Sequence, residues 1–254
     1  NVFTTNESPP SSLITFHHEL AQVPNWPNYL FFFCEVIPPK EGGETPVVSS
    51  HQVYKALGNG WMFSRAPEEK HPEFIKDISS KGVRYMRILS NGAHACLIAV
   101  GDDASSAMGR GWQNTYGSSD KQVVEQKLQA MGIEGEWLAN GCLKTITKLP
   151  AIVAEPRTGR KKMWFNQLYA AYTGWKDARN DPTKAVCFAD GTPFPPEPFE
   201  TMRNVMEVCG DSISMQANRV DMKWAQGDVM MIDNLVAMHS RNTFVPPRRI
   251  LAGL

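Results

Sequence analysis

The stretch LITFHHEL, residues 13–20, decides how this chain is interpreted. Its mixture of apolar and polar residues predicts a β-strand, in which side chains two positions apart lie on the same face. His17 and Glu19 therefore share one face of the strand, and His18 lies on the other. Two imidazoles and one carboxylate on one side of an ion leave its opposite positions open, as in the 2-His-1-carboxylate sites of non-haem Fe(II) oxygenases. We expect the second imidazole from His239, near the other end of the sequence.

Composition and charge exclude several classes of protein. Lys+Arg and Asp+Glu both number 26, so no overall field attracts nucleic acid or an anionic membrane. No apolar run approaches the ~20 residues that a transmembrane helix needs. The five cysteines are scattered and never spaced CxxC. This pattern argues against a disulfide framework and a zinc knuckle, and it favours an intracellular location, with the cytoplasm expected and an organelle not excluded. The sequence indicates no oligomeric state.

Strand-like segments dominate the organisation of the chain. Runs rich in β-forming residues predict a buried strand at 29–37 and further strands at 83–89, 143–147, 228–233 and 248–254. Helices are predicted at 50–57, at 120–131 with Ser119 as the N-cap, and at 200–209. A loop is predicted at 181–198, which is rich in proline and glycine.

The two parts of the expected metal site lie 239 − 19 = 220 positions apart, so both ends of the chain must meet in one core. We therefore predict a single domain over residues 1–254. Many short strands with few helices predict a mainly β architecture with flanking helices, as a sandwich or barrel of the jelly-roll type.

Three motifs follow the first stretch in an order that suits a metal cavity. GGET (42–45) could return the Thr45 hydroxyl to the cavity through a paired strand, and WAQGDVMMIDN (224–234) predicts a turn and strand leading to His239. PPRRI (246–250) then supplies two adjacent arginines, of which alternation allows only one to enter the cavity. The His-x-Glu spacing alone would favour an ordinary exposed strand. The accompanying motifs change that interpretation.

The motifs HHE, GGET, WFNQL (164–168), GDVMMIDN followed by a histidine, and PPRRI together resemble the taurine/2,4-D dioxygenase (TauD/TfdA) family. The resemblance runs over residues 13–254 and is closest to the clavaminate-synthase-like branch, whose metal carboxylate is Glu. It implies a double-stranded β-helix, or jelly roll, that binds Fe(II) and 2-oxoglutarate. The iron ligands it implies are His17, Glu19 and His239. The cosubstrate-binding residues it implies are Thr45 and Arg249.

The activity implied is an oxygenase that uses O2 and 2-oxoglutarate, releases succinate and CO2, and hydroxylates a small polar molecule. Desaturation and cyclisation stay open, and neither a nucleic-acid nor a membrane partner is expected. Two other enzyme classes share part of this ligand set. A JmjC-type protein hydroxylase usually anchors 2-oxoglutarate with lysine instead of arginine. A zinc hydrolase with a His2Glu site would need neither Thr45 nor Arg249. A jelly-roll binding module with a relic metal site is a third interpretation, which the intact triad disfavours.

Two further residues are candidates for substrate binding. Arg241 would share a face with His239 if the chain stays extended, and Asn166 could present its amide to the cavity. Gly253 stands where the taurine enzymes carry a second arginine, so taurine is not the expected substrate. The family also has a longer segment before its first motif, so we expect the N-terminal part of the domain to be missing here.

Overall fold

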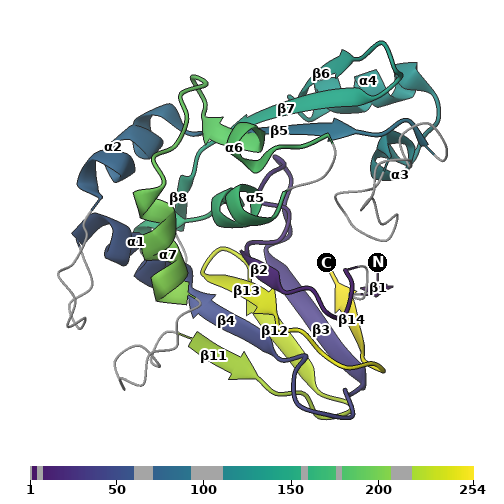
Figure 1. Ribbon diagram of the computed structural model, residues 1–254, viewed down its shortest axis with the longest axis vertical. Helices are drawn as coiled ribbons and strands as arrows, with labels where there is room; N and C mark the ends of the chain where they lie inside the picture. Colours follow the sequence, from purple (N-terminus) through teal and green to yellow (C-terminus); the bar gives the residue numbers. More distant parts are fainter. Residues whose placement is uncertain are drawn as a thin grey trace.

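A computed structural model describes residues 2–4, 8–59, 71–92, 111–155, 160–175, 179–206 and 219–254. Two four-stranded antiparallel sheets form one half of the molecule, and a third sheet with most of the helices forms the other (Figure 1). The two ends of the chain lie side by side, since Val2 and Gly253 are partners in neighbouring strands.

The first two sheets are built from strands that are distant in the sequence. One has the order β1 (Val2–Thr4), β14 (Arg249–Gly253), β3 (Tyr29–Val36) and β12 (Val229–Asp233). The other has the order β11 (Arg219–Met222), β4 (Thr45–Ser49), β13 (Ala237–Arg241) and β2 (Ile14–His17). Each sheet thus pairs strands from the beginning of the chain with strands from its end.

The remaining elements lie between these strands in the sequence. The third sheet has the order β10 (Val186–Phe188), β5 (Val83–Leu89), β7 (Leu143–Leu149) and β6 (Glu134–Trp137), and β8 (Ile152–Glu155) pairs with β9 (Arg160–Trp164). The helices are α1 (Ser50–Asn59), α2 (Pro72–Lys81), α3 (Trp112–Tyr116), α4 (Lys121–Ala130), α5 (Leu168–Gly174), α6 (Pro182–Ala185) and α7 (Glu197–Met206).

The first two sheets pack face to face over an apolar core. Leu30, Phe32 and Ile250 from one sheet contact Val47 and Ala237 from the other. Burial of these side chains drives the two sheets together. The prediction of a mainly β chain with a jelly roll is therefore confirmed.

The strand predicted at 29–37 is present as β3, but the expectation that it is buried holds for one of its faces only. Leu30 and Cys34 are fully buried, whereas Phe31 and Phe33 are exposed on the opposite face. One face of the strand is buried and the other exposed, as is common in antiparallel sheets. The sequence does not show this, because aromatic residues occupy both faces and no polar alternation is visible.

Two helix predictions also need correction. The N-cap of α4 is Asp120 and not Ser119, since the Asp120 carboxylate accepts a hydrogen bond of 2.8 Å from the Gln122 amide. The helix predicted at 200–209 starts earlier, as α7, and residues 207–209 lie outside the described part. The loop predicted at 181–198 contains α6 and the buried strand β10.

Within the described ranges, none of the helices has the length and apolar character needed to cross a membrane. Cys34, Cys142 and Cys187 are buried.

Gly42, the first glycine of GGET, should be sensitive to substitution. Gly42 has φ +105°, and a Cβ placed there would lie 2.4 Å from the Thr243 carbonyl oxygen. Gly42→Ala should therefore lower the free energy of unfolding by about 2 kcal/mol or more, measured by urea unfolding. Gly58→Ala is the matched control, because the nearest atom to its Cβ is 4.0 Å away and its helical backbone suits alanine. Equal stability of the two variants would contradict this turn geometry.

Candidate metal centre

The pairing of β2 with β13 brings two histidines together. His17 and His239 are direct partners in this antiparallel pair, and their ring centroids are 4.3 Å apart. Phe32 of the facing sheet packs on His239 at 5.4 Å between ring centroids. Contacts within and between the two sheets therefore hold both imidazoles in place without a metal ion.

Glu19 lies just beyond the end of β2, in a turn and not in the strand predicted to carry it. Asn234 holds this turn: its side-chain oxygen accepts from the Glu19 amide at 2.8 Å, and its side-chain nitrogen donates to the Glu19 carbonyl at 3.0 Å. Leu20 follows with φ +55°, a conformation that non-glycine residues rarely adopt. The fully buried Asn234 side chain therefore fixes the backbone that carries the carboxylate.

The three side chains form a compact set that could hold a metal ion. Their donor atoms all lie within 4.8 Å of one another, and Glu19 Oε2 lies 3.9 Å from the Nε2 atoms of both His17 and His239. Two atoms that bind one ion at ~2.1 Å can be at most ~4.2 Å apart, so both distances suit a shared ion. The described residues therefore fit the 2-His-1-carboxylate arrangement predicted from the sequence.

Protonation also suits metal binding. His17 Nδ1 lies 2.8 Å from the Thr15 carbonyl, which accepts only if the proton is on Nδ1, and this leaves the Nε2 lone pair for an ion. Burial, followed by the nearby His17 and His18, holds the pKa of His239 well below its ordinary value. His239 is therefore a neutral imidazole at physiological pH, as metal ligation requires.

His18 lies on the opposite face of the segment, as alternation predicts. It is fully buried, with Nε2 2.6 Å from the Ser50 hydroxyl and Nδ1 3.1 Å from the Asn166 carbonyl. Burial lowers the pKa of His18 to about 3, so it is neutral. This imidazole attaches the ligand segment to the start of α1 and to the residues before α5.

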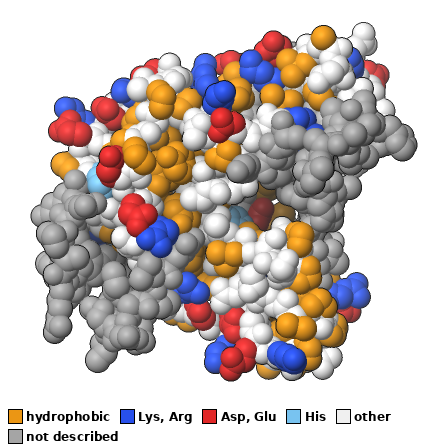
Figure 2. All heavy atoms as spheres, viewed as in Figure 1, with side chains coloured by type: hydrophobic (Ala, Val, Ile, Leu, Met, Phe, Trp, Pro, Cys, Tyr) orange, Lys and Arg blue, Asp and Glu red, His pale blue; other side chains and the backbone are white. Residues whose placement is uncertain are grey.

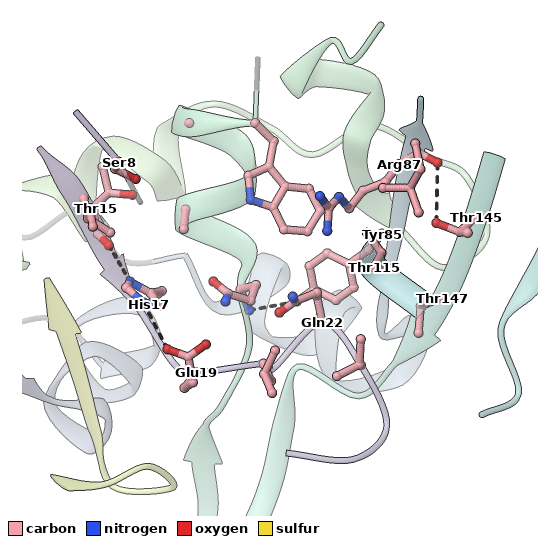
Figure 3. A pocket seen from close by; sticks show the side chains of 18 of the residues that line it. Ser8, Thr15, His17, Glu19, Gln22, Tyr85, Arg87, Thr115, Thr145 and Thr147 are labelled. Carbon is pink, nitrogen blue, oxygen red and sulfur yellow. Dashed lines mark hydrogen bonds and ion pairs between the residues drawn. The ribbon is translucent and has the colours of Figure 1, made fainter. Parts of the chain in front are cut away.

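A cavity of about 750 Å³ opens beside the ligands. Figure 2 shows a histidine and an acidic side chain deep in a hollow near the middle of the molecule. The jelly roll contributes His17 and Glu19 to the lining, and β5 contributes Tyr85 and Arg87. In Figure 3 these two groups lie on opposite sides of the pocket. The open side of the ligand set thus faces a space large enough for a small molecule.

Thr45 is buried at the start of β4, and its hydroxyl accepts a hydrogen bond of 3.1 Å from Trp224 Nε1. It shares a face of the strand with Val47, whose direct partner in β13 is His239. Two residues along a strand span ~7 Å, so Thr45 lies near the metal ligands on the inner side of the jelly roll.

The structure reverses the expected orientation of the two arginines in PPRRI. Arg249 points outward, is 54 % exposed and forms an ion pair of 2.8 Å with Glu35. Arg248 is 4 % exposed, donates to the Gly43 carbonyl at 3.0 Å and packs over the Phe244 ring. The prediction that Arg249 enters the cavity is therefore wrong in direction. Alternation was applied correctly, but only the ladder of β14 with β3 shows which arginine faces inward.

Arg241 does not point to the open side of the metal ligands, contrary to expectation. Its guanidinium donates to three backbone carbonyls in the segment before β2, those of Ser8, Pro9 and Ser12, at 2.7–3.1 Å. The pairing of β2 with β13 shifts register between His239 and Arg241, so simple alternation fails there. Arg241 is a buried clamp that holds one rim of the cavity.

Asn166 does not present its amide to the cavity either. Its side-chain nitrogen donates to the Ala151 carbonyl at 3.0 Å, and its oxygen accepts from the Leu168 amide at 3.0 Å. Its neighbour Gln167 lines the cavity instead. The expected role of Asn166 in substrate binding is therefore not supported by the geometry.

Sequence reasoning missed several residues at this site. The motif WAQGDVMMIDN (224–234) predicted a strand leading to His239, but it did not indicate that Asn234 would hold Glu19. Nothing in the spacing of Arg87 or Gln167 linked them to a metal site, because they come from β5 and the start of α5. Their proximity to the ligands is a property of the tertiary structure.

Comparison with known proteins decides the family. The family model described as taurine catabolism dioxygenase TauD, TfdA family matches residues 1–254. The chain belongs to this family. It is 44 % identical over 255 residues to a clavaminate synthase-like protein of Arabidopsis thaliana, covering all of this chain and 68 % of that protein. It is 24 % identical over 257 residues to the dapdiamide synthesis protein DdaC of Enterobacter agglomerans, with the same coverage.

Solved structures show more distant similarity. An asparagine oxygenase in complex with Fe(II), hydroxyasparagine and succinate aligns with 95 % of this chain at 14 % identity and a TM-score of 0.45. This chain spans 49 % of that protein. A 2,4-D dioxygenase homologue from Burkholderia xenovorans aligns with 94 % of this chain, again at 14 % identity and a TM-score of 0.45, and this chain spans 66 % of it.

Metal binding should depend on the ligand face of β2 and not on its opposite face. His17→Ala should weaken Fe(II) binding by more than about 100-fold. Removal of a residue that only supports a metal ligand already lowers metal affinity by up to about 100-fold, and loss of the ligand itself should cost more. His18→Ala should retain Fe(II) but lower the free energy of unfolding by about 2–4 kcal/mol, since it removes a buried ring and its hydrogen bonds. Anaerobic equilibrium dialysis and thermal unfolding measure the two effects.

His18→Gln serves as a milder variant if the alanine protein does not fold. Loss of Fe(II) by either His18 variant while His17→Ala retains it would overturn the assigned face.

Proposed function

We propose that this protein is an Fe(II)- and 2-oxoglutarate-dependent oxygenase that hydroxylates a small polar molecule and releases succinate and CO2. The observation that carries the proposal is the set His17, Glu19 and His239, clustered with its open side toward a cavity in a chain of the TauD/TfdA family. Three protein ligands leave positions on the ion for the cosubstrate and O2.

When bound, Fe(II) and 2-oxoglutarate would activate O2, which is the oxidant; one oxygen atom would enter succinate as 2-oxoglutarate loses CO2, and the other would enter the substrate. The residues of this chain would hold the ion, orient the cosubstrate and exclude bulk water. Asn234 and His18 fix the backbone on either side of the ligand segment, so the ligands require little rearrangement on binding.

The inner side of the jelly roll supports binding of the cosubstrate's distal carboxylate. Arg241 and Arg248 both contact the Phe244 ring, at 5.2 and 5.3 Å from guanidinium carbon to ring centroid. Burial, followed by the charge of Arg241, lowers the pKa of Arg248 to about 10, so Arg248 stays charged at neutral pH. Among the described residues, Glu44 is the carboxylate that acts on the charge of Arg248, and it lies near two buried cations, Arg241 and Arg248. An anion bound there would be attracted by both guanidinium groups.

We therefore assign the anchoring role to Arg248, in place of the Arg249 implied by the family resemblance. Thr45 keeps the role that the resemblance implies, because it is buried two residues after Gly43, whose carbonyl binds Arg248. A planar guanidinium is well suited to hold a carboxylate through two parallel hydrogen bonds.

The alternative functions are less well supported. A JmjC-type hydroxylase would be expected to anchor the cosubstrate with lysine, whereas the inward-facing residue here is Arg248. A His2Glu zinc hydrolase would not account for buried cations on the inner side of the jelly roll. Family membership also favours the oxygenase over both.

The direct test is succinate formation by the purified protein. Succinate should appear only when Fe(II), 2-oxoglutarate and O2 are all supplied, and His239→Ala should abolish it because it removes a ligand. Hydrolytic activity with Zn(II), in the absence of any 2-oxoglutarate turnover, would contradict the proposal.

The arginine assignment makes a separate prediction. Arg248→Ala should raise the KM for 2-oxoglutarate by about 30-fold or more, because a buried charge pair that loses one partner costs ~2–5 kcal/mol. Arg249→Ala should have little effect, since its exposed ion pair with Glu35 contributes less than ~1 kcal/mol. Initial rates of succinate formation over a range of 2-oxoglutarate concentrations measure both variants. The opposite order of effects would return the role to Arg249.

A further inference from the structure

We propose that the cavity continues away from the metal ligands into an apolar compartment, and that this compartment binds an apolar arm of the substrate. The compartment is lined by Leu89, Tyr116, Met131 and Ile133. This inference rests on the proposed function and adds the shape of the substrate to it. The substrate is an elongated molecule, polar at one end and apolar at the other.

Strand β5 forms a wall along the length of the cavity. Tyr85, Arg87 and Leu89 alternate along this strand, share one of its faces and all line the cavity. The four residue steps from Tyr85 to Leu89 span ~13 Å in an extended strand. The cavity is therefore long enough for a ligand that reaches well beyond the candidate metal ligands.

The Tyr85 end of this wall is the end nearer to the candidate ligands. The Gln167 amide donates to the Tyr85 hydroxyl at 2.9 Å. The preceding residue, Asn166, contacts His18 Nδ1 through its backbone carbonyl at 3.1 Å, and His18 belongs to the ligand segment. A short chain of hydrogen bonds thus ties this end of β5 to the ligand segment.

The Leu89 end lies farther from the ligands, where α3, α4 and β6 gather at the end of β5 (Figure 1). The Trp112 amide at the start of α3 donates to the Ser90 carbonyl at 3.0 Å, which fixes α3 beside this end of the strand. Asn114 and Thr115 of the same helix are exposed and line the cavity where it meets solvent. Side chains from several elements thus enclose the compartment.

The compartment is apolar. Leu89 and Ile133 are buried in a small core, and Tyr116 and Met131 pack against that core. Burial raises the pKa of the Tyr116 phenol, although the charge of Arg87 opposes the shift, so the phenol is neutral and partly withdrawn from water. None of the four lining side chains carries a charge, and the group that they match best is a hydrocarbon chain or ring.

The polar end of the cavity has two acceptors that suit a hydrogen-bond donor. Gln22 Oε1 and Gln167 Oε1 are buried, and neither has a hydrogen-bond partner among the described residues. Buried polar atoms are rarely left unpaired, so an N–H group on a ligand would satisfy them. A straight-chain primary amide matches both ends of the cavity and carries no charge, which makes it a suitable probe.

The test measures the binding of primary amides from propanamide to octanamide by isothermal titration calorimetry. The purified protein is titrated with each amide under nitrogen, in the presence of Fe(II) and 2-oxoglutarate. Each added methylene should lower the Kd about threefold as it leaves water, until the chain fills the compartment. Met131→Gln keeps the length of the side chain but makes it polar. It should weaken octanamide binding by about fivefold or more and leave propanamide binding unchanged, and Ile133→Thr should act in the same way.

Met231→Gln is the matched control. It is the same substitution at a residue that is exposed on β12 and does not line the cavity. It should bind every amide as the unmodified protein does, which would also exclude adsorption to the exposed apolar face around Met231.

Three results would overturn the inference. They are equal affinity for propanamide and octanamide or no binding of either, a length dependence that persists in both Met131→Gln and Ile133→Thr, and a length dependence that is lost in Met231→Gln. Succinate formation by the same preparation, once O2 is admitted, tests the proposed function separately. Its absence would refute that function without changing the amide affinities, so the two failures are distinguishable.

Discussion

The antiparallel pairing of β2 with β13 is the constraint on which the rest of the site depends. It places His17 opposite His239, although the two are 239 − 17 = 222 positions apart. Closing so long a loop costs conformational entropy that this strand pair alone could not offset. Burial of the apolar core between the two sheets offsets this loss of entropy, and strands from both ends of the chain contribute to that core. The candidate metal ligands are thus adjacent because the jelly roll is closed.

The register of β2 then decides which of its side chains face the cavity. A shift of one residue in β2 would exchange His17 for His18 and direct a tethering imidazole toward the metal. The structure opposes such a shift from both faces: His18 is bound to Ser50 and Asn166, and Asn234 holds the backbone of Glu19. Polar contacts that are fully buried are costly to break, which makes them effective in fixing a register.

The cavity has two walls of different origin. The jelly roll contributes the metal ligands and the buried arginines, which would carry out the reaction common to the family. The third sheet contributes Arg87, and Gln167 and Trp175, which flank α5, complete the other wall away from the candidate ligands. Separation of the two walls allows the substrate-facing side chains to change while the metal ligands stay in place.

The sequence by itself determined the jelly-roll class and the opposite orientations of His17 and His18, and it identified the candidate ligands that the structure brings together. These follow from strand alternation and from the order of a few motifs, both of which are local properties of the chain. Strand β5 was predicted with its observed bounds for the same reason. The aromatic residues on both faces of β3 misled the burial prediction, because periodicity disappears when both faces are apolar.

Only the tertiary structure decided which arginine of PPRRI faces inward, where Arg241 and Asn166 direct their polar atoms, and which residues form the far wall of the cavity. Alternation states that neighbours point to opposite faces, but the ladder with β3 determines which face is inside. The register shift after His239 then turned Arg241 toward the segment before β2. Arg87 reaches the site through packing of a separate sheet, and no local spacing in the sequence encodes a contact of that kind.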